Sequence, residues 1–416
     1  MTKKTSETRI INPFKLQSIR TLWPNAELSV SSTNQRLAKK IRSANTSYEI
    51  QSNALVNGNS LNGVHDINGD PLKITFLRRG MPSGMIREAP EYPIKPPEKI
   101  YKHSFSISKK LERAYWISSL ELDHFGHTLT ETASSLFPLL AWNKVGFNLS
   151  QIDIIITENF LNRKSIELLH SAFPKLSLNR IHVARQDETI LIEKLFIPHP
   201  TMIIRESVSE GQILATKAMV EILLRDELTT QTIQKRQKQN VPANANAGNA
   251  TSTNTFKTPS PGKLWLSRRN VSNRHFLEEQ ELERVLSDCG WHILCPEDQK
   301  LDTQLSALSE AKVIAGTMSS SFHLLMALSQ KKTTKSIYML AANQVQTATY
   351  FEQFKRQGFR FTIDNCLEYS TTSNKQLKLR EDITVQKIAY SINTFAHPAL
   401  KKKKSHRSNR LTRPSR

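Results

Sequence analysis

The stretch AKVIAGTMSSSFHLLMAL, residues 311–328, decides the fold because it joins a short apolar run to a helical pattern through a polar turn. The run KVIAG (312–316) has the composition of a buried strand, which other elements cover on both faces. The pattern SSFHLLMALSQ (320–330) predicts a helix. A strand that leads directly into a helix is the repeating unit of a parallel sheet covered by helices.

The same alternation extends outward from this stretch. Upstream it runs through a strand in KLWLSRR, a helix in LEEQELERVLSDCG, a strand in WHILCP and a helix in LDTQLSALSEA, and downstream it reaches a strand in KSIYML (335–340). The first half of the chain shows a similar alternation, with a helix predicted from Phe125 to Trp142. We therefore expect an α/β protein of two Rossmann-like α/β domains that face a central cleft, where ligands of such folds bind.

Changes in composition set the predicted domain boundaries. Residues 1–70 form a polar N-terminal extension, which could also supply strands to the first domain. Residues 71–227 form the first α/β domain, residues 228–262 a low-complexity linker or insertion, and residues 263–395 the second α/β domain. Residues 396–416 form a basic disordered tail.

Composition also limits the class of protein. The chain has 416 residues, of which 38% are hydrophobic and three are cysteines. Three cysteines are too few for a disulfide framework and indicate a reducing compartment. No apolar stretch approaches the roughly 18 residues of a transmembrane helix, and the amino terminus lacks the apolar segment of a secretion signal. These features predict a cytoplasmic protein.

The net charge of +21 favours anionic partners. The last 16 residues, KKKKSHRSNRLTRPSR, carry four Lys and four Arg. Such a tail suits either a solvated end or a peripheral contact with the anionic inner membrane. No zinc-finger spacing, RNP sequence or helix-turn-helix pattern is recognisable, so nucleic acid is not the expected partner.

Three serines and a histidine follow the strand that ends at Gly316. Ser319, Ser320 and Ser321 would bring hydroxyls and backbone N–H groups to the positive end of a helix dipole, which suits a phosphate or diphosphate. A plain helix-capping role explains the serines equally well. His323 would face the same pocket or pack against the sheet.

Arg268 and Arg269 follow the first strand of the second domain. A guanidinium group can bind two phosphate oxygens at once, so this pair is a second candidate for phosphate binding. Because side chains alternate along a strand, only one of the two is expected in the cleft. The alternative is a solvated pair of charges.

The segment HFGHTLTET (124–132) opens the long helix of the first domain. His127 and Glu131 are four residues apart and share a helical face, and His124 lies three residues earlier. This spacing is not that of a zinc metalloprotease, and we expect no metal here. His127 is our candidate general base, oriented by Glu131, because imidazole titrates near working pH. A structural role for either histidine is the alternative.

These pieces, in this order, resemble glycosyltransferase family 61. The matching stretches are HFGHTLTET (124–132), LWLSRRNVSNRHFLEEQELERVL (264–286) and PEDQKLDTQLSALSEAKVIAGTMSSSFHLLMAL (296–328). The similarity spans about residues 75–395 and is interrupted by the low-complexity segment.

The resemblance implies a GT-B-like fold in which the first domain binds the acceptor and the second binds a nucleotide-sugar donor. It implies inverting transfer to a glycan or another hydroxyl acceptor, in polysaccharide biosynthesis, with no cofactor and no metal. The charge on the leaving diphosphate would be met by the serine-rich helix start and an arginine. His124, Gln304 and Gly316 would hold the substrate-binding residues in place without contacting the substrate.

Two positions depart from the family pattern. Met318 stands where the family often has an acidic residue, and Ser319 stands where it has a glycine, whereas His323 is retained. These departures keep open a family member that binds a nucleotide or a glycan without turnover. A basic nucleic-acid-binding protein is the other alternative.

Overall fold

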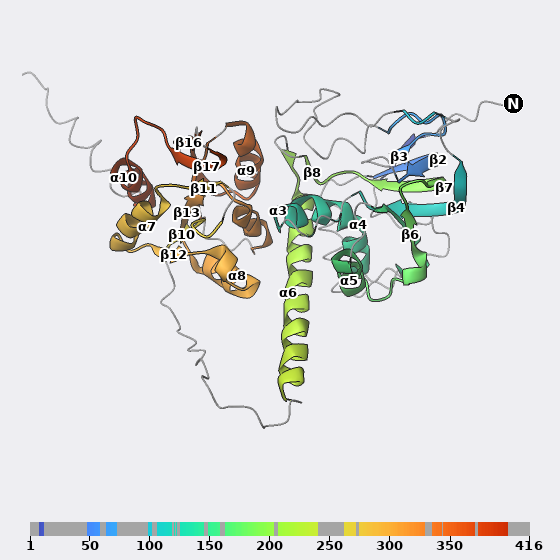
Figure 1. Cartoon of the computed structure of the whole chain (residues 1–416), viewed down its shortest axis with the longest axis horizontal. Coiled ribbons are helices and arrows are strands. Elements are labelled where there is room, and N and C mark those ends of the chain that lie inside the picture. The colour runs from blue at the N-terminus through green and yellow to red at the C-terminus, as the bar shows by residue number, and fades with distance from the viewer. Residues whose placement is uncertain are drawn as a thin grey trace, which may run out of the picture. The chain divides into compact units, whose positions relative to one another are not determined.

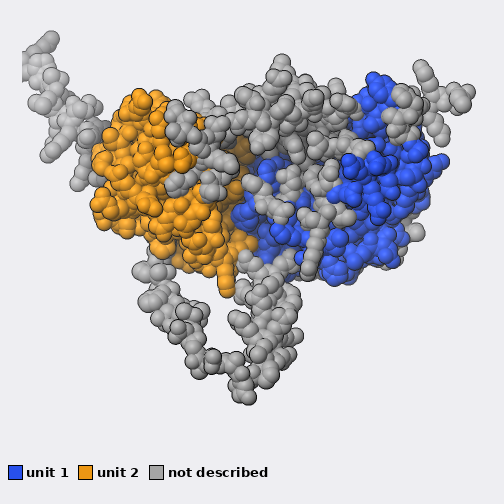
Figure 2. Space-filling view, viewed as in Figure 1, with its two compact units in different colours: residues 1–236 blue, residues 237–416 orange. Residues whose placement is uncertain are grey.

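The computed structural model describes residues 8–11, 48–58, 64–72, 99–101, 106–118, 120, 122, 125–144, 149–158, 163–203, 207–239, 262–271, 274–328, 335–342, 344–370 and 373–397. The chain divides into two compact units, residues 1–236 and residues 237–416 (Figure 2). Each unit has its own sheets and helices, with parallel strand pairs in both, so the predicted α/β class is confirmed (Figure 1).

The main sheet of unit 1 is mixed rather than purely parallel. Its strand order is β1-β2-β7-β4-β5-β6, with β3 beside β2. β4 runs parallel to β5 and β7, and β5 runs parallel to β6, whereas β1, β3 and β7 pair antiparallel with β2. The strand bounds are β1 Thr8–Ile11, β2 Tyr48–Asn57, β3 Val64–His65, β4 Ile107–Trp116, β5 Ile154–Thr157, β6 Ile181–Ala184 and β7 Thr189–Pro198. A separate hairpin pairs β8 (Met202–Ile203) with β9 (Ser207–Val208).

Strand β2 comes from the segment predicted as a polar extension. Its residues Ala54, Leu55 and Val56 are fully buried, because β2 is paired on both edges and both of its faces are covered. The Asn, Ser and Gly residues around these three positions conceal the strand in the sequence. The described part of residues 1–70 therefore supplies strands to the first unit, which is one of the two roles considered for this segment.

The helices of unit 1 are α3 (Phe125–His127), α4 (Ala133–Lys144), α5 (Arg163–Ala172) and α6 (Glu210–Gln239), and the π-helix η4 (Thr128–Thr132) joins α3 to α4. The helix predicted from residue 125 is therefore present, with a π-helical segment inserted. Helix α6 extends through the first residues of the predicted linker, and residues 240–261 lie outside the described part. Trp142 of α4 packs edge-on against Phe196 of β7, and Phe196 stacks on Tyr115 of β4. These three rings fix the helix to the sheet.

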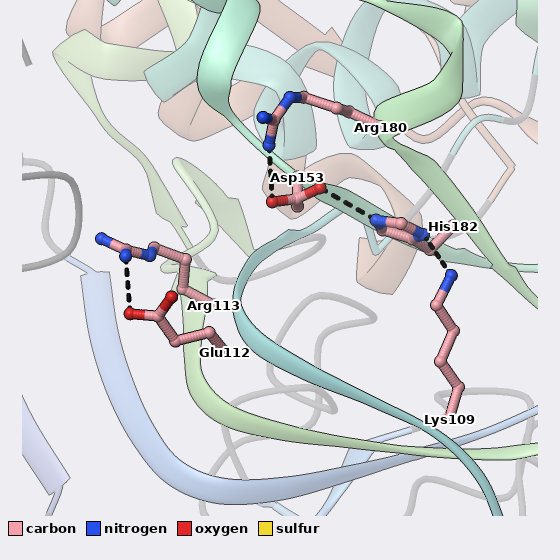
Figure 3. Close-up of polar contacts among 6 residues, drawn as sticks. All are labelled: Lys109, Glu112, Arg113, Asp153, Arg180 and His182. Atoms are coloured by element: carbon pink, nitrogen blue, oxygen red, sulfur yellow. Dashed lines mark hydrogen bonds and ion pairs between the residues drawn. The ribbon is translucent and has the colours of Figure 1, made fainter.

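A chain of polar contacts ties the strands β4, β5 and β6 together (Figure 3). Asp153, just before β5, accepts from Arg180 Nη1 and pairs with His182 Nε2, both at 2.9 Å. His182 Nδ1 lies 2.9 Å from Lys109 Nζ of β4. Because an ammonium group only donates, Nδ1 accepts and Nε2 carries the ring proton toward Asp153.

We expect Asp153→Ala to lower the free energy of unfolding of unit 1 by about 1–2 kcal/mol, because Arg180 and His182 lose their shared acceptor. Urea unfolding followed by a probe in unit 1 measures this loss. Glu112→Ala is the control, because Glu112 is exposed and pairs only with its neighbour Arg113 in the described contacts (Figure 3). An equal loss in both variants would contradict a structural role for the Asp153 chain.

Unit 2 is built on a five-stranded sheet in which every neighbouring pair is parallel. The strand order is β12-β10-β13-β14-β15. The strand bounds are β10 Lys263–Leu266, β12 His292–Leu294, β13 Val313–Thr317, β14 Ser336–Leu340 and β15 Arg360–Asp364. A smaller sheet joins β11 (His275–Phe276), β17 (Ser373–Leu379) and β16 (Leu367–Ser370).

Helices cover both faces of the five-stranded sheet (Figure 1). Trp265, Ala315 and Leu340 point to one face, where they pack with helices α7 (Glu279–Asp288) and α10 (Val385–Ala396). Their neighbours along the strands point to the other face. That face lies toward α8 (Leu301–Glu310), the 3₁₀-helix η9 (Ser320–Ala327) and α9 (Gln344–Arg356). Unit 2 therefore has the predicted Rossmann-like layering.

The order of the strands places a switch point between β10 and β13. From β10 the chain moves outward on one side to β12, and it then returns to the other side of β10 to form β13, β14 and β15. In open parallel sheets, ligands bind at the carboxyl ends of the strands that flank such a reversal. Here those ends lead into Ser267–Arg269 and Met318–Ser321.

Candidate functional site

Arg268, Arg274 and Tyr350 of unit 2 act on one another electrostatically near the switch point. Arg268 follows β10 and is buried, with 7% of the residue exposed. The charge of Arg274 lowers the pKa of Arg268, and both arginines act on the pKa of Tyr350 of α9. Burial outweighs the two arginines and raises the pKa of Tyr350 to about 12, so this phenol stays protonated. Its hydroxyl donates to the Ser319 carbonyl at 3.1 Å, which joins α9 to the segment that follows β13.

The electrostatics of this corner favour an anion. Burial is the main cause that lowers the pKa of Arg268, and the like charge of Arg274 is the second. Glu297 and Glu279 act in the opposite direction but more weakly. Arg274 adopts a φ of +59°, a left-handed conformation that costs a residue with a side chain about 1 kcal/mol. A diphosphate beside the two guanidinium groups would offset both their mutual repulsion and their loss of water.

Arg269 does not share this corner. Its Nη1 donates to Glu283 Oε2 of α7 at 3.1 Å, and its guanidinium also contacts Cys295. The two neighbouring arginines therefore face different surroundings.

The three serines begin a 3₁₀-helix rather than the predicted α-helix. The Ser319 side chain makes no capping hydrogen bond, so the simple capping role does not apply to it. Its backbone is extended, with φ −153° and ψ 163°, which any residue adopts. Ser319 therefore introduces no backbone strain that a glycine would avoid. Ser319 and Ser321 are buried, and Ser320 is partly exposed.

Helix α9 explains why η9 is a 3₁₀-helix. Such helices are rarely longer than about four residues, whereas η9 has eight. Three α9 side chains donate to a row of its carbonyls: Tyr350 to Ser319, Gln353 to Phe322 at 2.8 Å, and Gln357 to Leu325 at 2.7 Å. Three residues of a 3₁₀-helix rise about 6 Å, and the α9 spacings of three and four residues rise about 4.5 and 6 Å, so the two rows run alongside each other over this length.

His323 lies within this contact between η9 and α9. Its Nδ1 is 2.9 Å from Gln353 Oε1, and its ring stacks on Tyr350 with centroids 4.8 Å apart. The structure thus brings Arg268, Ser319 and His323 together around Tyr350.

Gln304 and Gly316 support the same corner. Gln304 of α8 donates to the carbonyls of Pro296 and Gln299, and so holds the turn that carries Glu297 near Arg268. Gly316 pairs with Leu266, and a Cβ at this position would lie 2.7 Å from the Leu266 carbonyl oxygen. A larger residue would push the end of β10 away from β13.

Unit 1 contains a histidine–glutamate pair just before α4, with the histidine in α3 and the glutamate in η4. His127 Nδ1 lies 2.7 Å from Glu131 Oε1. The Glu131 side chain is 5% exposed and that of His127 is 39% exposed, so the carboxyl is inside and the ring is reachable. The Thr130 hydroxyl contacts Glu131 Oε2 and the Gly126 carbonyl, which further fixes the carboxyl.

The π-helix η4 is also held by side chains of another helix. A π-helical segment interrupts the usual backbone ladder, and such segments are frequent at functional sites. Gln212 of α6 donates to the carbonyls of Leu129 and Thr130, and Thr216 donates to that of Leu129. Thr201 donates to Gln212 Oε1 at 2.6 Å, which sets the orientation of this amide.

Several predictions lie outside the described residues or concern absences. His124 and the basic tail from residue 398 are outside the described part. Within the described part, no group of three or more His, Cys, Asp or Glu side chains is placed to hold a metal ion. Nor is any described helix long and apolar enough to cross a membrane.

The Glycosyltransferase 61 family model matches residues 125–335, from the start of α3 to the residue before β14. The chain belongs to the glycosyltransferase 61 family. Family membership indicates a glycosyltransferase in general terms. No curated protein matches the sequence.

The family 61 match includes His127, Arg268, Arg274 and His323 but ends before α9. Tyr350, Gln353 and Gln357 were not predicted as site residues, because nothing in their local sequence shows that α9 packs on η9. Arg274 was also missed, although it lies within the quoted stretch LWLSRRNVSNRHFLEEQELERVL. Its signal was the basic residue itself, five positions after Arg269.

The sequence of this family 61 protein also gave no sign of Glu279. It is fully buried on α7, and its Oε1 accepts from the Arg268 backbone N–H at 2.9 Å. Burial raises its pKa to about 7, and the Arg268 N–H opposes that shift. Glu279 fixes the backbone at Arg268 and is neutral below about pH 7.

We expect the stability of unit 2 to fall as the pH rises from about 4.5 to 7, because the folded state keeps the Glu279 proton that the unfolded chain releases. The shift corresponds to about 3 kcal/mol at most. Glu279→Gln should remove this part of the pH dependence. Urea unfolding at pH 5, 6, 7 and 8 measures it, and an equally steep profile in Glu279→Gln would disprove the assignment.

Proposed function

We propose that the protein transfers a sugar from a nucleoside-diphosphate sugar to a hydroxyl group of a glycan acceptor, with inversion, in the synthesis of a polysaccharide. Unit 2 would bind the donor and unit 1 the acceptor, in a GT-B arrangement. The observation that carries this proposal is the buried Arg268 beside Arg274 at the switch point of a parallel sheet.

The donor's diphosphate would lie between the carboxyl ends of β10 and β13. Arg268 and Arg274 supply two guanidinium groups, and the start of η9 supplies the serine hydroxyls. As the bond from the sugar to the diphosphate breaks, negative charge grows on the leaving phosphate oxygen. Fixed positive groups that are already desolvated stabilise such charge without reorganising. The proposal needs no metal, so transfer should persist in the presence of a chelator.

On the acceptor side, His127 would act as the general base. Its Nδ1 faces the Glu131 carboxylate, so a neutral ring carries its proton on Nδ1 and offers the Nε2 lone pair. Nε2 takes the proton of the acceptor hydroxyl as the oxygen attacks the anomeric carbon. The nucleoside diphosphate leaves from the opposite side, which inverts that carbon. Glu131 stabilises the imidazolium that forms.

We also propose that the protein acts in the cytoplasm, where its basic C-terminal segment makes a peripheral contact with an anionic membrane. The four Lys and four Arg of the last 16 residues support it, since each can add attraction to anionic lipid.

Turnover of a donor panel tests the function. The full chain is incubated with UDP-, GDP-, dTDP- and CMP-sugars and a mixture of glycan acceptors, and released nucleotide and glycosylated product are measured by chromatography. We expect transfer from one diphosphate donor and none from CMP-sugars, which carry a single phosphate. Neither binding nor turnover with any diphosphate donor would refute the proposal.

Met318 and Ser319 support a second candidate, a family member that binds its nucleotide without turnover. Met318 is buried and donates its backbone N–H to the Leu340 carbonyl. Its side chain carries no charge, at a position where the family often has an acidic residue. Tight binding of a nucleoside diphosphate by calorimetry, with no product from any acceptor, would favour this candidate.

A further inference from the structure

Gln353 of α9 has an unusual set of contacts for a residue outside the family match. It is fully buried, and its amide bonds to two different parts of η9. Nε2 donates to the Phe322 carbonyl at 2.8 Å, and Oε1 lies 2.9 Å from His323 Nδ1.

The Phe322 carbonyl sets the orientation of the amide. A carbonyl only accepts, so the NH₂ group must face Phe322, and the oxygen must then face the histidine. An amide oxygen also only accepts, so His323 Nδ1 must carry a proton. In the neutral ring Nε2 therefore holds a lone pair. In the protonated ring Nε2 gains a proton, and the bond from Nδ1 to Gln353 remains intact.

We propose that Gln353 is a positioning residue of the donor site, which holds His323 with the proton on Nδ1 and so makes Nε2 the ring atom that meets the diphosphate of the donor. This inference rests on the proposed function for its ligand, but not for the tautomer. When the diphosphate binds, Nε2 takes up one proton from solvent, and the N–H group that forms donates a hydrogen bond to a phosphate oxygen. The proton stays on Nε2, so the ring is an imidazolium in the bound state.

The surroundings of His323 favour this uptake only when the anion is present. The ring stacks on Tyr350, which burial keeps protonated, and Arg268 and Arg274 lie near that phenol. The two arginines oppose a further positive charge on the ring in the empty site. A diphosphate would reverse the local field, so binding and protonation support each other.

Gln357 provides a matched control one turn later on α9. It is also buried, and it also donates to an η9 carbonyl, that of Leu325 at 2.7 Å. Its described contacts do not include His323, and its Oε1 lies 3.4 Å from Gln353 Nε2, so Gln357→Met removes a contact of the Gln353 NH₂ group but not the one to His323. Gln353→Met and Gln357→Met both remove an amide while keeping an unbranched side chain of similar length. A purely structural role predicts similar effects from the two.

The first test measures the tautomer without any ligand. The full chain is labelled with ¹⁵N-histidine, long-range ¹H–¹⁵N correlation spectra are recorded near neutral pH, and a His323→Phe variant assigns the signals. We expect the Nδ1–H tautomer in the wild type and in Gln357→Met, and its loss in Gln353→Met. An Nε2–H tautomer in the wild type, or an unchanged ring in Gln353→Met, overturns the proposal.

The second test measures linked protonation with inorganic diphosphate as the probe. Calorimetry in buffers of different ionisation enthalpy reports the protons taken up on binding. Because diphosphate itself titrates, the result is the difference between variants. We expect the wild type and Gln357→Met to take up more protons than His323→Phe, and Gln353→Met to match His323→Phe with affinity about 10-fold below the wild type. Equal uptake in Gln353→Met and the wild type overturns the proposal.

Two further comparisons keep the tests decisive. If Gln353→Met fails to fold, Gln353→Glu replaces it, and its carboxylate, which only accepts, should keep the proton on Nδ1; a ring without that proton also overturns the proposal. If the wild type binds neither diphosphate nor any nucleoside diphosphate, the proposed donor site is wrong. The tautomer test would still decide whether Gln353 holds the His323 proton on Nδ1.

Discussion

Replacing Arg268 with Ala is expected to weaken binding of the donor's nucleoside diphosphate by about 10- to 100-fold, the usual loss for a charged hydrogen bond. The effect should be this large because the guanidinium is already desolvated and makes its contact inside the fold. The free energy of unfolding of the same variant shows whether a loss of affinity comes from a loss of stability. Calorimetry and urea unfolding measure the two quantities.

Arg269→Ala is the matched control for Arg268→Ala. The two residues are adjacent, but Arg269 pairs with Glu283 and contacts Cys295 rather than Arg274 and Tyr350. We expect Arg269→Ala to keep affinity within a factor of about two, because its charge is largely exposed and screened. Equal losses of affinity from both substitutions would show that general positive charge, and not the corner around Arg268, attracts the nucleotide.

Replacing His127 with Ala is expected to lower kcat by about 10²- to 10⁴-fold, the usual contribution of a positioned general base. Affinity for the nucleoside diphosphate should not change, since His127 belongs to unit 1. Glu131→Gln should give a smaller loss of kcat, because an amide can still contact Nδ1 but no longer stabilises the imidazolium. Single-turnover rates with a saturating donor measure both effects.

A second histidine–carboxylate pair in unit 1 serves as the control. His182 pairs with Asp153 as His127 pairs with Glu131, but its side chain is 11% exposed and also contacts Lys109 (Figure 3). His182→Ala should lower stability and keep kcat once the protein is folded. Full activity in His127→Ala would remove His127 from the reaction.

The sequence predicted the elements of unit 2 well because they are local. Short apolar runs such as those around Trp265, Ile314 and Ile337 are recognisable by composition, and helices between them follow from periodicity. The order of the strands in the sheet is not local. It follows from which strands pair, so the switch point beside Arg268 could be located only in the structure.

The type of helix could not be predicted from the sequence either. An α-helix was predicted in both candidate regions, but η4 is a π-helix and η9 is a 3₁₀-helix. In each case side chains from another helix satisfy the carbonyls of the distorted segment: Gln212 and Thr216 for η4, and Gln353 with its neighbours for η9. Contacts between residues about 30 or 80 positions apart leave no periodic signal, because propensity reports only local preference.

The candidate residues themselves were partly predictable. His127 and Glu131 share a helical face at four-residue spacing, and the structure gives them a 2.7 Å contact. Arg268 and His323 were identified as charged or titratable groups near strand ends. Tyr350, which joins them, comes from α9 and carries no motif. A site assembled from several elements can be recognised in the sequence only where its residues are close together along the chain.

Hydrogen exchange of the intact chain, with and without the nucleoside diphosphate that the donor panel identifies, tests the central claim most directly. If the diphosphate binds at the switch point, amide protection should rise in Leu266–Val271, in Ser319–Leu328 and in α9, with little change at β12 or α5. Protection that appears only in unit 1, or nowhere near the ends of β10 and β13, would contradict the account.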